Sequence, residues 1–431
     1  MKRVILSGFF TLLLFTLHAQ DTLTVMQYNL LYYGVNNEFC TAENNSLSAK
    51  DPALKKILDE VQPDIFTVNE LSSTVSVHSH LLDEILNTNS LKIYEKADYD
   101  PYVTSDICSM LFYNSSKLRI ARQAIAQSLV RDINLYELYY LSDDLAQGDT
   151  AFLVCIVGHL KAGNTSADES TRSIMVSLTM QFLENGYQSK NLLFMGDFNY
   201  YTAFEPGFQK MTNYSNPDLR FFDPVNRMGS WNNNSAYTDV HTQSTHTSSN
   251  GCPSTGGMDD RFDFILASGE VMDGEQYVRY IPGSYHAFGQ DGNRFNGTVN
   301  GSPTNSSVSQ QVADALYAIS DHLPVVMKLK VDKTLDVYER PGNPFRLIVS
   351  PNPVSAGNPQ IKLEFSGITS GDYQVEVYDL QGHIIKTTSY VPSSGNSTLR
   401  WNLNGLSSGM YLLKISSEGK VPVVQRFVVT K

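Results

Sequence analysis

The chain has 431 residues, of which 42% are apolar and 18% are charged, so it is not a disordered or highly charged protein and can form sizeable cores. Residues 21–331 hold 20 basic and 36 acidic side chains, a net charge of −16, which repels polyanions and weighs against non-specific coating of nucleic acid. Four cysteines in a chain of this length exclude a disulfide-rich scaffold.

The N-terminus has the pattern of a secretory signal peptide. Lys2 and Arg3 precede an uncharged apolar run over residues 4–17, and the small residue Ala19 follows. The run is shorter than the roughly 20 apolar residues of a transmembrane helix. We therefore expect residues 1–20 to be a signal peptide and the mature chain to have no stable membrane insertion. The alternative is a buried N-terminal helix.

Export would make disulfide bonds possible, because secreted proteins mature in an oxidising environment. The sequence allows three full pairings and does not choose among them. Cys108 and Cys155 lie in strand-like runs, where a free cysteine is often simply a small buried apolar residue. The four are Cys40, Cys108, Cys155 and Cys252.

Helical and strand patterns alternate over residues 21–331. Apolar residues at helical spacing predict one helix over residues 51–61. A second helix is predicted to run to about Asn185 from Ser166, whose spacing to Glu169 fits a capping box. Short apolar runs predict strands over 23–28, 65–68, 110–113, 152–158, 192–195, 262–266 and 325–329.

Two polar stretches, 226–258 and 283–309, interrupt these elements and are expected to be loops that are functional or mobile. The alternation around them predicts an α/β or α+β domain built on β-sheet.

The C-terminal segment has a different pattern. Residues 332–344 are predicted to be a linker, and residues 345–431 contain short strand-like runs separated by turn signals, which predicts a small β-sandwich. Its blocks at 349–353, 377–382 and 406–412 resemble the C-terminal sorting domain of type IX secretion substrates. The resemblance implies recognition by the type IX secretion machinery and a secreted or cell-surface protein. The alternative is a carbohydrate-binding or adhesion sandwich.

Polar side chains follow or begin the predicted strands at six places. Polar groups gathered at strand ends are a common way for a sheet to present a site to solvent. Each place is a weak signal alone, but six over about 300 residues are hard to explain as turns. They are Asn29, Asn69-Glu70, His159, Asp197 with Asn199, Asp263, and Asp321-His322.

In this order, the six pieces resemble the endonuclease/exonuclease/phosphatase superfamily, which includes deoxyribonuclease I, inositol polyphosphate phosphatases and bacterial sphingomyelinases. The most specific blocks are 196–199 and 320–324, and the resemblance covers about 22–330. It implies an α+β fold, a two-layer β-sandwich flanked by helices with the site at one edge. Because the predicted signal peptide ends at residue 20 and the predicted linker begins at residue 332, we expect the catalytic domain to span residues 21–331.

The resemblance also implies a divalent cation, Mg²⁺ or alternatively Mn²⁺ or Ca²⁺, because a phosphate ester needs charge neutralisation and hard oxygen ligands suit these ions. Glu70 resembles the metal-binding glutamate of the family. Asn29 and Asp321 would contribute oxygen atoms directly or through water. The alternatives are a solvated acid at a strand end for Glu70 and a structural turn for Asn29.

The remaining site residues resemble the catalytic groups. His322 resembles a general base, and Asp263 the acid that orients its ring. His159 and Asn199 resemble donors to the phosphoryl oxygens or the leaving group. Asp197 resembles the residue that positions water or supports the metal.

Two of these assignments have structural alternatives. Asp263 would instead pair with Arg261, and His159 would be a buried core histidine.

Three further groups lie near these motifs. Arg172 would reach a phosphate or pair with an acid one turn earlier on its helix, and the two are equally favoured. His241 and His246 suggest a second metal site, but a flexible solvated loop is the preferred interpretation. Four tyrosines adjoin the motifs, where stacking on a substrate and simple packing are both open, namely Tyr32, Tyr33, Tyr200 and Tyr201.

Two departures from the family pattern bear on the substrate. Asn69 stands where many members have glutamine, and no arginine follows Glu70 where deoxyribonuclease I-like members have one. The second departure and the acidic charge weaken the case for cleavage of duplex DNA.

The leading hypothesis is a secreted divalent-metal-dependent phosphodiester hydrolase, a nuclease for extracellular DNA or RNA. Alternatives are a phosphomonoesterase or sphingomyelinase-like enzyme and a catalytically silent surface-binding protein.

Overall fold

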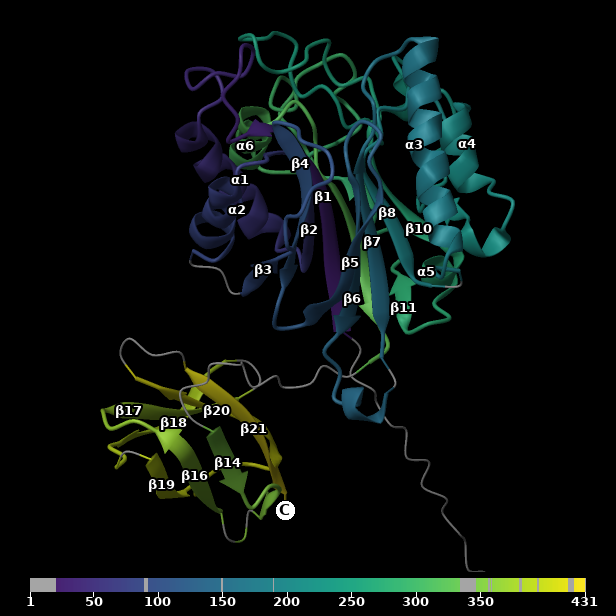
Figure 1. Cartoon of the computed structure of the whole chain (residues 1–431). Coiled ribbons are helices and arrows are strands. Elements are labelled where there is room, and N and C mark those ends of the chain that lie inside the picture. Colours follow the sequence, from purple (N-terminus) through teal and green to yellow (C-terminus); the bar gives the residue numbers. More distant parts are fainter. Residues whose placement is uncertain are drawn as a thin grey trace, which may run out of the picture. The chain divides into compact units, whose positions relative to one another are not determined.

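The computed structural model describes residues 21–88, 92–148, 150–188, 190–333, 346–355, 357, 359–379, 382–393, 395–417 and 422–430. The chain divides into two compact units, Met1–Asp336 and Val337–Lys431 (Figure 1). The predicted signal peptide and residues 334–344 of the predicted linker lie outside the described residues. In the part of the chain that is described, no helix is both long and apolar enough to cross a membrane.

The first unit is built on two mixed β-sheets. The first sheet consists of β1 (Asp21–Tyr33), β2 (Ile65–Ser72), β3 (Tyr94–Lys96), β4 (Ile107–Asn114), β11 (Val278–Tyr280), β12 (His286–Ala287) and β13 (Val325–Val331). Its order is β11-β13-β1-β2-β4-β3, with β12 also paired to β13. β1 and β2 run parallel and are joined by helix α1 (Leu47–Val61), as a parallel pair requires a crossover connection.

The second sheet repeats this design. It consists of β5 (Leu118–Gln127), β6 (Ile133–Tyr140), β7 (Phe152–His159), β8 (Leu192–Asp197), β9 (Phe221–Phe222) and β10 (Asp263–Ser268), in the order β5-β6-β7-β8-β10-β9. Parallel strands β7 and β8 are joined by helix α3 (Ser166–Glu184), and β10 runs antiparallel to β8. All seven strands predicted between residues 23 and 329 are present, whereas β5 and β6 were not predicted.

The cores explain why several central strands read as continuous apolar runs. Cys155 and Val157 of β7 belong to a buried cluster that also contains residues of the first sheet. Val154 and Ile156 of the same strand pack in a second cluster with α3. Since successive side chains of a strand point to opposite faces, β7 is buried on both.

The helices lie beside the two sheets. Figure 1 shows α1 and α6 (Gln310–Ile319) beside the first sheet and α3 and α4 (Pro206–Thr212) beside the second. The remaining described helices are α2 (Val75–His80), α5 (Gly269–Asp273), the π-helix η1 (Leu81–Leu86), and the 3₁₀ turns Leu145–Gln147, Pro217–Leu219 and Ser235–Tyr237.

One local prediction was wrong. The capping box of α3 is formed by Thr165 and Asp168, one residue earlier than predicted, because the Thr165 hydroxyl accepts from the Asp168 amide at 3.2 Å. The stretch 226–258 is a loop over most of its length, as predicted, but Trp231 and His241 within it are fully buried. Its polar composition serves internal hydrogen bonds, such as that from the Trp231 indole to the Tyr200 carbonyl at 2.6 Å.

A close approach between β7 and β8 requires glycine at the end of β8. A Cβ atom on Gly196 would lie 1.7 Å from the carbonyl oxygen of Gly158, and the φ angle of Gly196 is +147°. Only glycine has no side-chain atom there. The contact brings the ends of the two strands together immediately before Asp197.

The second unit, over its described residues, is all-β. One sheet has the order β14-β16-β19, and the other β15-β21-β20-β17-β18. Leu363 and Phe427, from different sheets, share one buried cluster, so apolar side chains from both sheets form the core. The bounds are β14 Arg346–Ser350, β15 Val354–Ser355, β16 Gln360–Ile368, β17 Tyr373–Tyr378, β18 Ile384–Tyr390, β19 Gly395–Asn402, β20 Gly409–Ser416 and β21 Val423–Thr430.

Candidate active site

Strand direction brings the six polar pieces to one edge of the two sheets. Asn29 is paired with Asn69 in the parallel register of β1 and β2, so Glu70 follows directly beside it. Asp197 is paired with both His159 and Asp263 in the registers of β7, β8 and β10. The carboxyl ends of parallel strands and the start of an antiparallel neighbour therefore meet at the same edge.

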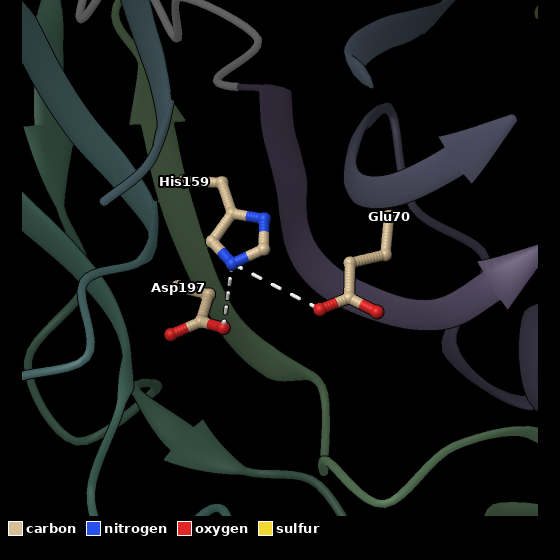
Figure 2. Close-up of side chains that lie close together, drawn as sticks. All are labelled: Glu70, His159 and Asp197. Atoms are coloured by element: carbon tan, nitrogen blue, oxygen red, sulfur yellow. Dashed lines mark ion pairs between the residues drawn. The ribbon is translucent and has the colours of Figure 1, made fainter. Parts of the chain in front are cut away.

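Glu70, His159 and Asp197 form the centre of the site. The Nε2 atom of His159 lies 3.4 Å from Asp197 Oδ2 and 3.8 Å from Glu70 Oε1 (Figure 2). One ligand atom from each of the three residues lies within 4.8 Å of the others. Asn29 Nδ2 donates to Glu70 Oε1 at 3.1 Å and to Asp197 Oδ2 at 3.0 Å, which joins the carboxylates of the two sheets.

His322 and Asp263 form a buried pair next to this centre. His322 Nδ1 lies 2.7 Å from Asp263 Oδ2, and its Nε2 lies 3.8 Å from Asp197 Oδ2. Arg261, the alternative partner considered for Asp263, instead pairs with Asp223 at 2.8 Å. The geometry fixes the imidazole with one nitrogen on an acid and the other toward the centre.

Asp321 completes the acidic side of the site. Its Oδ2 accepts from the Ser254 amide at 2.8 Å and from Gln243 Nε2 at 3.3 Å. Its Oδ1 lies 3.9 Å from His322 Nε2 and, although buried, has no hydrogen-bond partner among the described residues. An orphaned buried carboxylate oxygen is unfavourable unless a ligand satisfies it.

The electrostatics follow from burying several acids together. Burial, with the charge of Asp321, raises the pKa of Glu70. Burial also raises the pKa of Asp197 to about 7. Burial opposes protonation of His322, but the carboxylates of Asp263 and Asp197 outweigh it and raise the pKa of the ring well above its ordinary value.

These observations fit a divalent cation. The donor set contains hard carboxylate oxygens of Glu70 and Asp197, and the orphaned oxygen of Asp321. A cation would favour the ionised forms that burial disfavours. Asn29 was expected to offer an oxygen to the cation. Its Oδ1 instead accepts from the Leu31 amide at 2.9 Å, and its Nδ2 faces the carboxylates.

The backbone is strained at several positions in the site. Glu70 has φ +55°, Asn199 has φ +54° and Tyr32 has φ +50°. Non-glycine residues in this left-handed region cost about 1–3 kcal/mol each, and such residues cluster at functional sites. The Tyr32 amide donates to Glu70 Oε2 at 3.2 Å, so the strained turn holds the glutamate in place.

Asn199 and His159 lie at the ends of the neighbouring strands. The Asn199 amide donates to Asp197 Oδ1 at 3.1 Å, and its side-chain nitrogen reaches the Leu160 carbonyl at 3.4 Å. Burial, together with the charge of Arg131, holds the pKa of His159 well below its ordinary value. His159 is therefore a neutral imidazole in this environment, and a role as hydrogen-bond donor stays a prediction.

One residue of the site was missed by sequence reasoning. Gln243 Nε2 lies 2.7 Å from His322 Nε2, in a loop whose Asn/Ser/Thr-rich sequence carries no periodic signal. Asn69, singled out in the sequence without an assigned role, accepts through Oδ1 from Gln27 Nε2 at 2.7 Å and from the Asp197 amide at 2.8 Å.

Three further predictions were wrong. Arg172 is fully buried and pairs with Glu205 at 2.7 Å, so it neither reaches a phosphate nor pairs one turn earlier. His241 and His246 are buried, at 0% and 8% exposure, rather than solvated. His241 Nε2 lies 2.8 Å from the Trp231 carbonyl, and His246 stacks on an aromatic ring.

The tyrosines divide into two groups. Tyr33 and Tyr200 are fully buried and pack in the cores. Tyr32 and Tyr201 are partly exposed. Stacking on a substrate therefore stays open for the second pair alone.

One of the possible disulfides is formed. It joins Cys40 to Cys252, whereas Cys108 and Cys155 are free. The bond ties the segment after β1 to the loop that carries Gln243 and Ser254, both of which contact Asp321. The disulfide therefore connects two parts of the chain that line the site.

The fold and the site together describe an α+β protein with acids, amides and histidines gathered at one sheet edge. Residues 349–430 match the family model of the secretion system C-terminal sorting domain, which confirms the prediction for this segment. No curated protein matches the chain.

Solved structures similar to this chain include endonuclease/exonuclease/phosphatase proteins. One, a member of that family from Bacteroides thetaiotaomicron, is 14% identical, covers 73% of this chain and 96% of its own, and has a TM-score of 0.44. D. rerio TDP2 complexed with single strand DNA product is 12% identical, with 72% and 99% covered and a TM-score of 0.43. A mannosyl-6-phosphatase from Bacteroides thetaiotaomicron VPI-5482 is 15% identical, with 71% and 99% covered and a TM-score of 0.42.

Proposed function

We propose that residues 21–331 form a secreted, divalent-metal-dependent phosphoester hydrolase, with the two sheets as the layers of a helix-flanked sandwich. The observation that carries the proposal is the convergence of the His322–Asp263 pair and the Glu70, His159 and Asp197 cluster at one edge. An oriented imidazole beside a cation site is the arrangement that metal-assisted attack of water requires.

Glu70, Asp197 and Asp321 would hold the cation, with Asn29 orienting the carboxylates of Glu70 and Asp197. When bound, the ion supplies neutralisation of the phosphoryl charge. The positive charge of the ion would also offset part of the negative charge that raises the pKa of His322. The pKa would then fall, and the imidazole would more readily be neutral and able to accept a proton.

His322 would then accept the proton of the attacking water at Nε2, while Asp263 holds Nδ1. Gln243 lies at hydrogen-bond distance from the same Nε2, so the water must share or replace that contact. Asn199 and His159 would donate to the phosphoryl oxygens or the leaving group.

The C-terminal unit supports export of this enzyme. Its match to a secretion sorting domain is the basis for proposing type IX secretion and a cell-surface or extracellular location. The predicted signal peptide would supply passage across the inner membrane.

The test uses the purified full chain with Mg²⁺, Mn²⁺ or Ca²⁺ on plasmid DNA, single-stranded DNA, RNA, bis-p-nitrophenyl phosphate and p-nitrophenyl phosphate. Hydrolysis should require a metal and be lost in His322→Ala. The control His286→Ala, at an exposed position in β12, should retain activity. Hydrolysis that survives both a chelator and His322→Ala would contradict the mechanism.

A further inference from the structure

A cavity of about 150 Å³ adjoins the candidate site on the side of His159. Its wall is formed by the loop 98–103, the start of β4, and residues of β5 and β6. Its volume lies below the roughly 300–1,000 Å³ of sites for drug-sized ligands. The cavity therefore suits one small chemical group.

Arg131 lies where the cavity meets the site. It lines the cavity together with His159, so its positive charge lies close to the catalytic centre. Its Nη1 donates to the Leu160 carbonyl at 3.3 Å, and among the described residues no carboxylate lies within 4.0 Å of it. A cation without an acidic partner at this place is available to a phosphate.

Hydrogen-bonding groups line the rest of the cavity. Asp132 Oδ2 accepts from the amides of Tyr102 at 2.8 Å and Val103 at 3.2 Å, but its buried Oδ1 has no partner among the described residues. Tyr136, only 3% exposed, also lines the cavity. Hydroxyl groups on a ligand would satisfy the Asp132 oxygen and would be able to bond the Tyr136 hydroxyl, because each hydroxyl donates and accepts.

The charge at the cavity mouth argues against a polymer of phosphates. Asp98 and Asp100 are exposed there and Asp132 lies deeper, against the single cation of Arg131. A nucleic-acid strand would bring further phosphates toward these acids, which is unfavourable. A small neutral group carrying one phosphate avoids this repulsion.

We propose that the cavity is the subsite for the alcohol part of the substrate and takes one small polyhydroxylated group, a sugar or polyol, whose single phosphate contacts Arg131. This inference rests on the proposed function. The oxygen of water forms a new bond to phosphorus, the bond from phosphorus to the ester oxygen breaks, and the alcohol leaves with a proton. The products are the free polyol and inorganic phosphate.

The experiment compares kcat/KM of the full chain, with its activating metal, for glucose 6-phosphate, p-nitrophenyl phosphate and a single-stranded oligonucleotide. Nitrophenolate is the better leaving group, so a preference for glucose 6-phosphate must come from binding. We expect a preference of at least about tenfold, since a site built for hydroxyl groups discriminates against ligands that lack them.

Tyr136→Phe removes one hydroxyl from the cavity. It should raise KM for glucose 6-phosphate about five- to tenfold, the value of one hydrogen bond, and raise KM for p-nitrophenyl phosphate, whose ring carries no hydroxyl group, by a smaller factor. Tyr102→Ala, at a side chain 76% exposed, should act in the same direction without disturbing the core. The matched control is Tyr187→Phe, a buried tyrosine whose hydroxyl lacks a partner among the described residues and which does not line the cavity.

The outcomes separate the two proposals. If no phosphate ester, including bis-p-nitrophenyl phosphate, is hydrolysed with any metal, the proposed function itself fails. If aryl phosphates are hydrolysed but glucose 6-phosphate is not preferred, or the oligonucleotide is preferred, the subsite assignment is overturned and the hydrolase stands. Equal effects of Tyr136→Phe and Tyr187→Phe would also overturn it.

Discussion

Asp197 is a buried acid among other acids, and this gives a prediction in which stability and activity move in opposite directions. Its side chain is 3% exposed, and burial raises its pKa from the usual 3.8 to about 7. Each pKa unit is worth 1.36 kcal/mol, so ionised Asp197 destabilises the metal-free fold by about 4 kcal/mol above pH 7. Asp197→Asn removes the charge and keeps the shape.

The substitution also costs one hydrogen bond. Asp197 Oδ2 accepts from Asn29 Nδ2 at 3.0 Å, and an amide nitrogen at that position loses this bond, at about 1 kcal/mol. We therefore expect Asp197→Asn to stabilise the metal-free protein at pH 8 by about 3 kcal/mol. At about 2–4 °C per kcal/mol, the melting temperature should rise by roughly 6–12 °C.

The pH dependence of the stability difference shows whether the ionisation of Asp197 causes it. Because the folded pKa of Asp197 is raised, the folded protein binds more protons than the unfolded chain between about pH 4 and 7, so its stability falls as pH rises through this range. The advantage of Asp197→Asn should therefore be full above pH 7, whereas at pH 4 the lost hydrogen bond should leave the variant about 1 kcal/mol less stable than the wild type. Thermal unfolding of the chelator-treated proteins, followed by circular dichroism from pH 4 to 8, measures it.

Metal and a matched buried acid provide the controls. Mn²⁺ at 100 times its Kd should stabilise the wild type by about 2.7 kcal/mol. It should stabilise Asp197→Asn far less, because this variant lacks one metal ligand, and the variant should also lose activity. Asp223→Asn breaks the buried pair with Arg261 and should destabilise at pH 8 by about 3–5 kcal/mol. A destabilised Asp197→Asn at pH 8, or the same shift at pH 4 and 8, would refute the reasoning.

Other parts of the molecule give three more predictions. Asp263→Asn should lower kcat about 10⁴-fold in steady-state assays, with the fold retained by circular dichroism, because the orienting acid is lost. Gly196→Ala should lower the melting temperature by more than about 6 °C, and Gly158→Ala, whose Cβ has ordinary 3.4 Å contacts, by much less. Reduction of Cys40–Cys252 should cost about 2–4 kcal/mol in unfolding experiments and lower kcat.

Much of the fold was predictable because its signals are local. The strand predicted at residues 23–28 lies in β1, and the helix predicted at 51–61 lies in α1, since both periodicities depend on neighbouring residues. β5 and β6 were missed because their outward residues are polar or half-buried and lack a clean alternation. Burial of Arg172 was missed because its partner Glu205 comes from α4's N-terminus, 33 residues away.

The sequence by itself determined which side chains are available and that several stand at strand ends, because these are properties of short segments. Only the tertiary structure decided which of them meet. Asn29 and Asp197 are 168 residues apart in the chain, yet their side chains form a hydrogen bond of 3.0 Å. His322 and Asp263 are 59 residues apart, and their side chains are hydrogen-bonded as well. Strand pairing is a long-range choice that follows from packing both sheets, so no local pattern encodes it. For the same reason Gln243, in a loop without periodicity, is visible only in the folded chain.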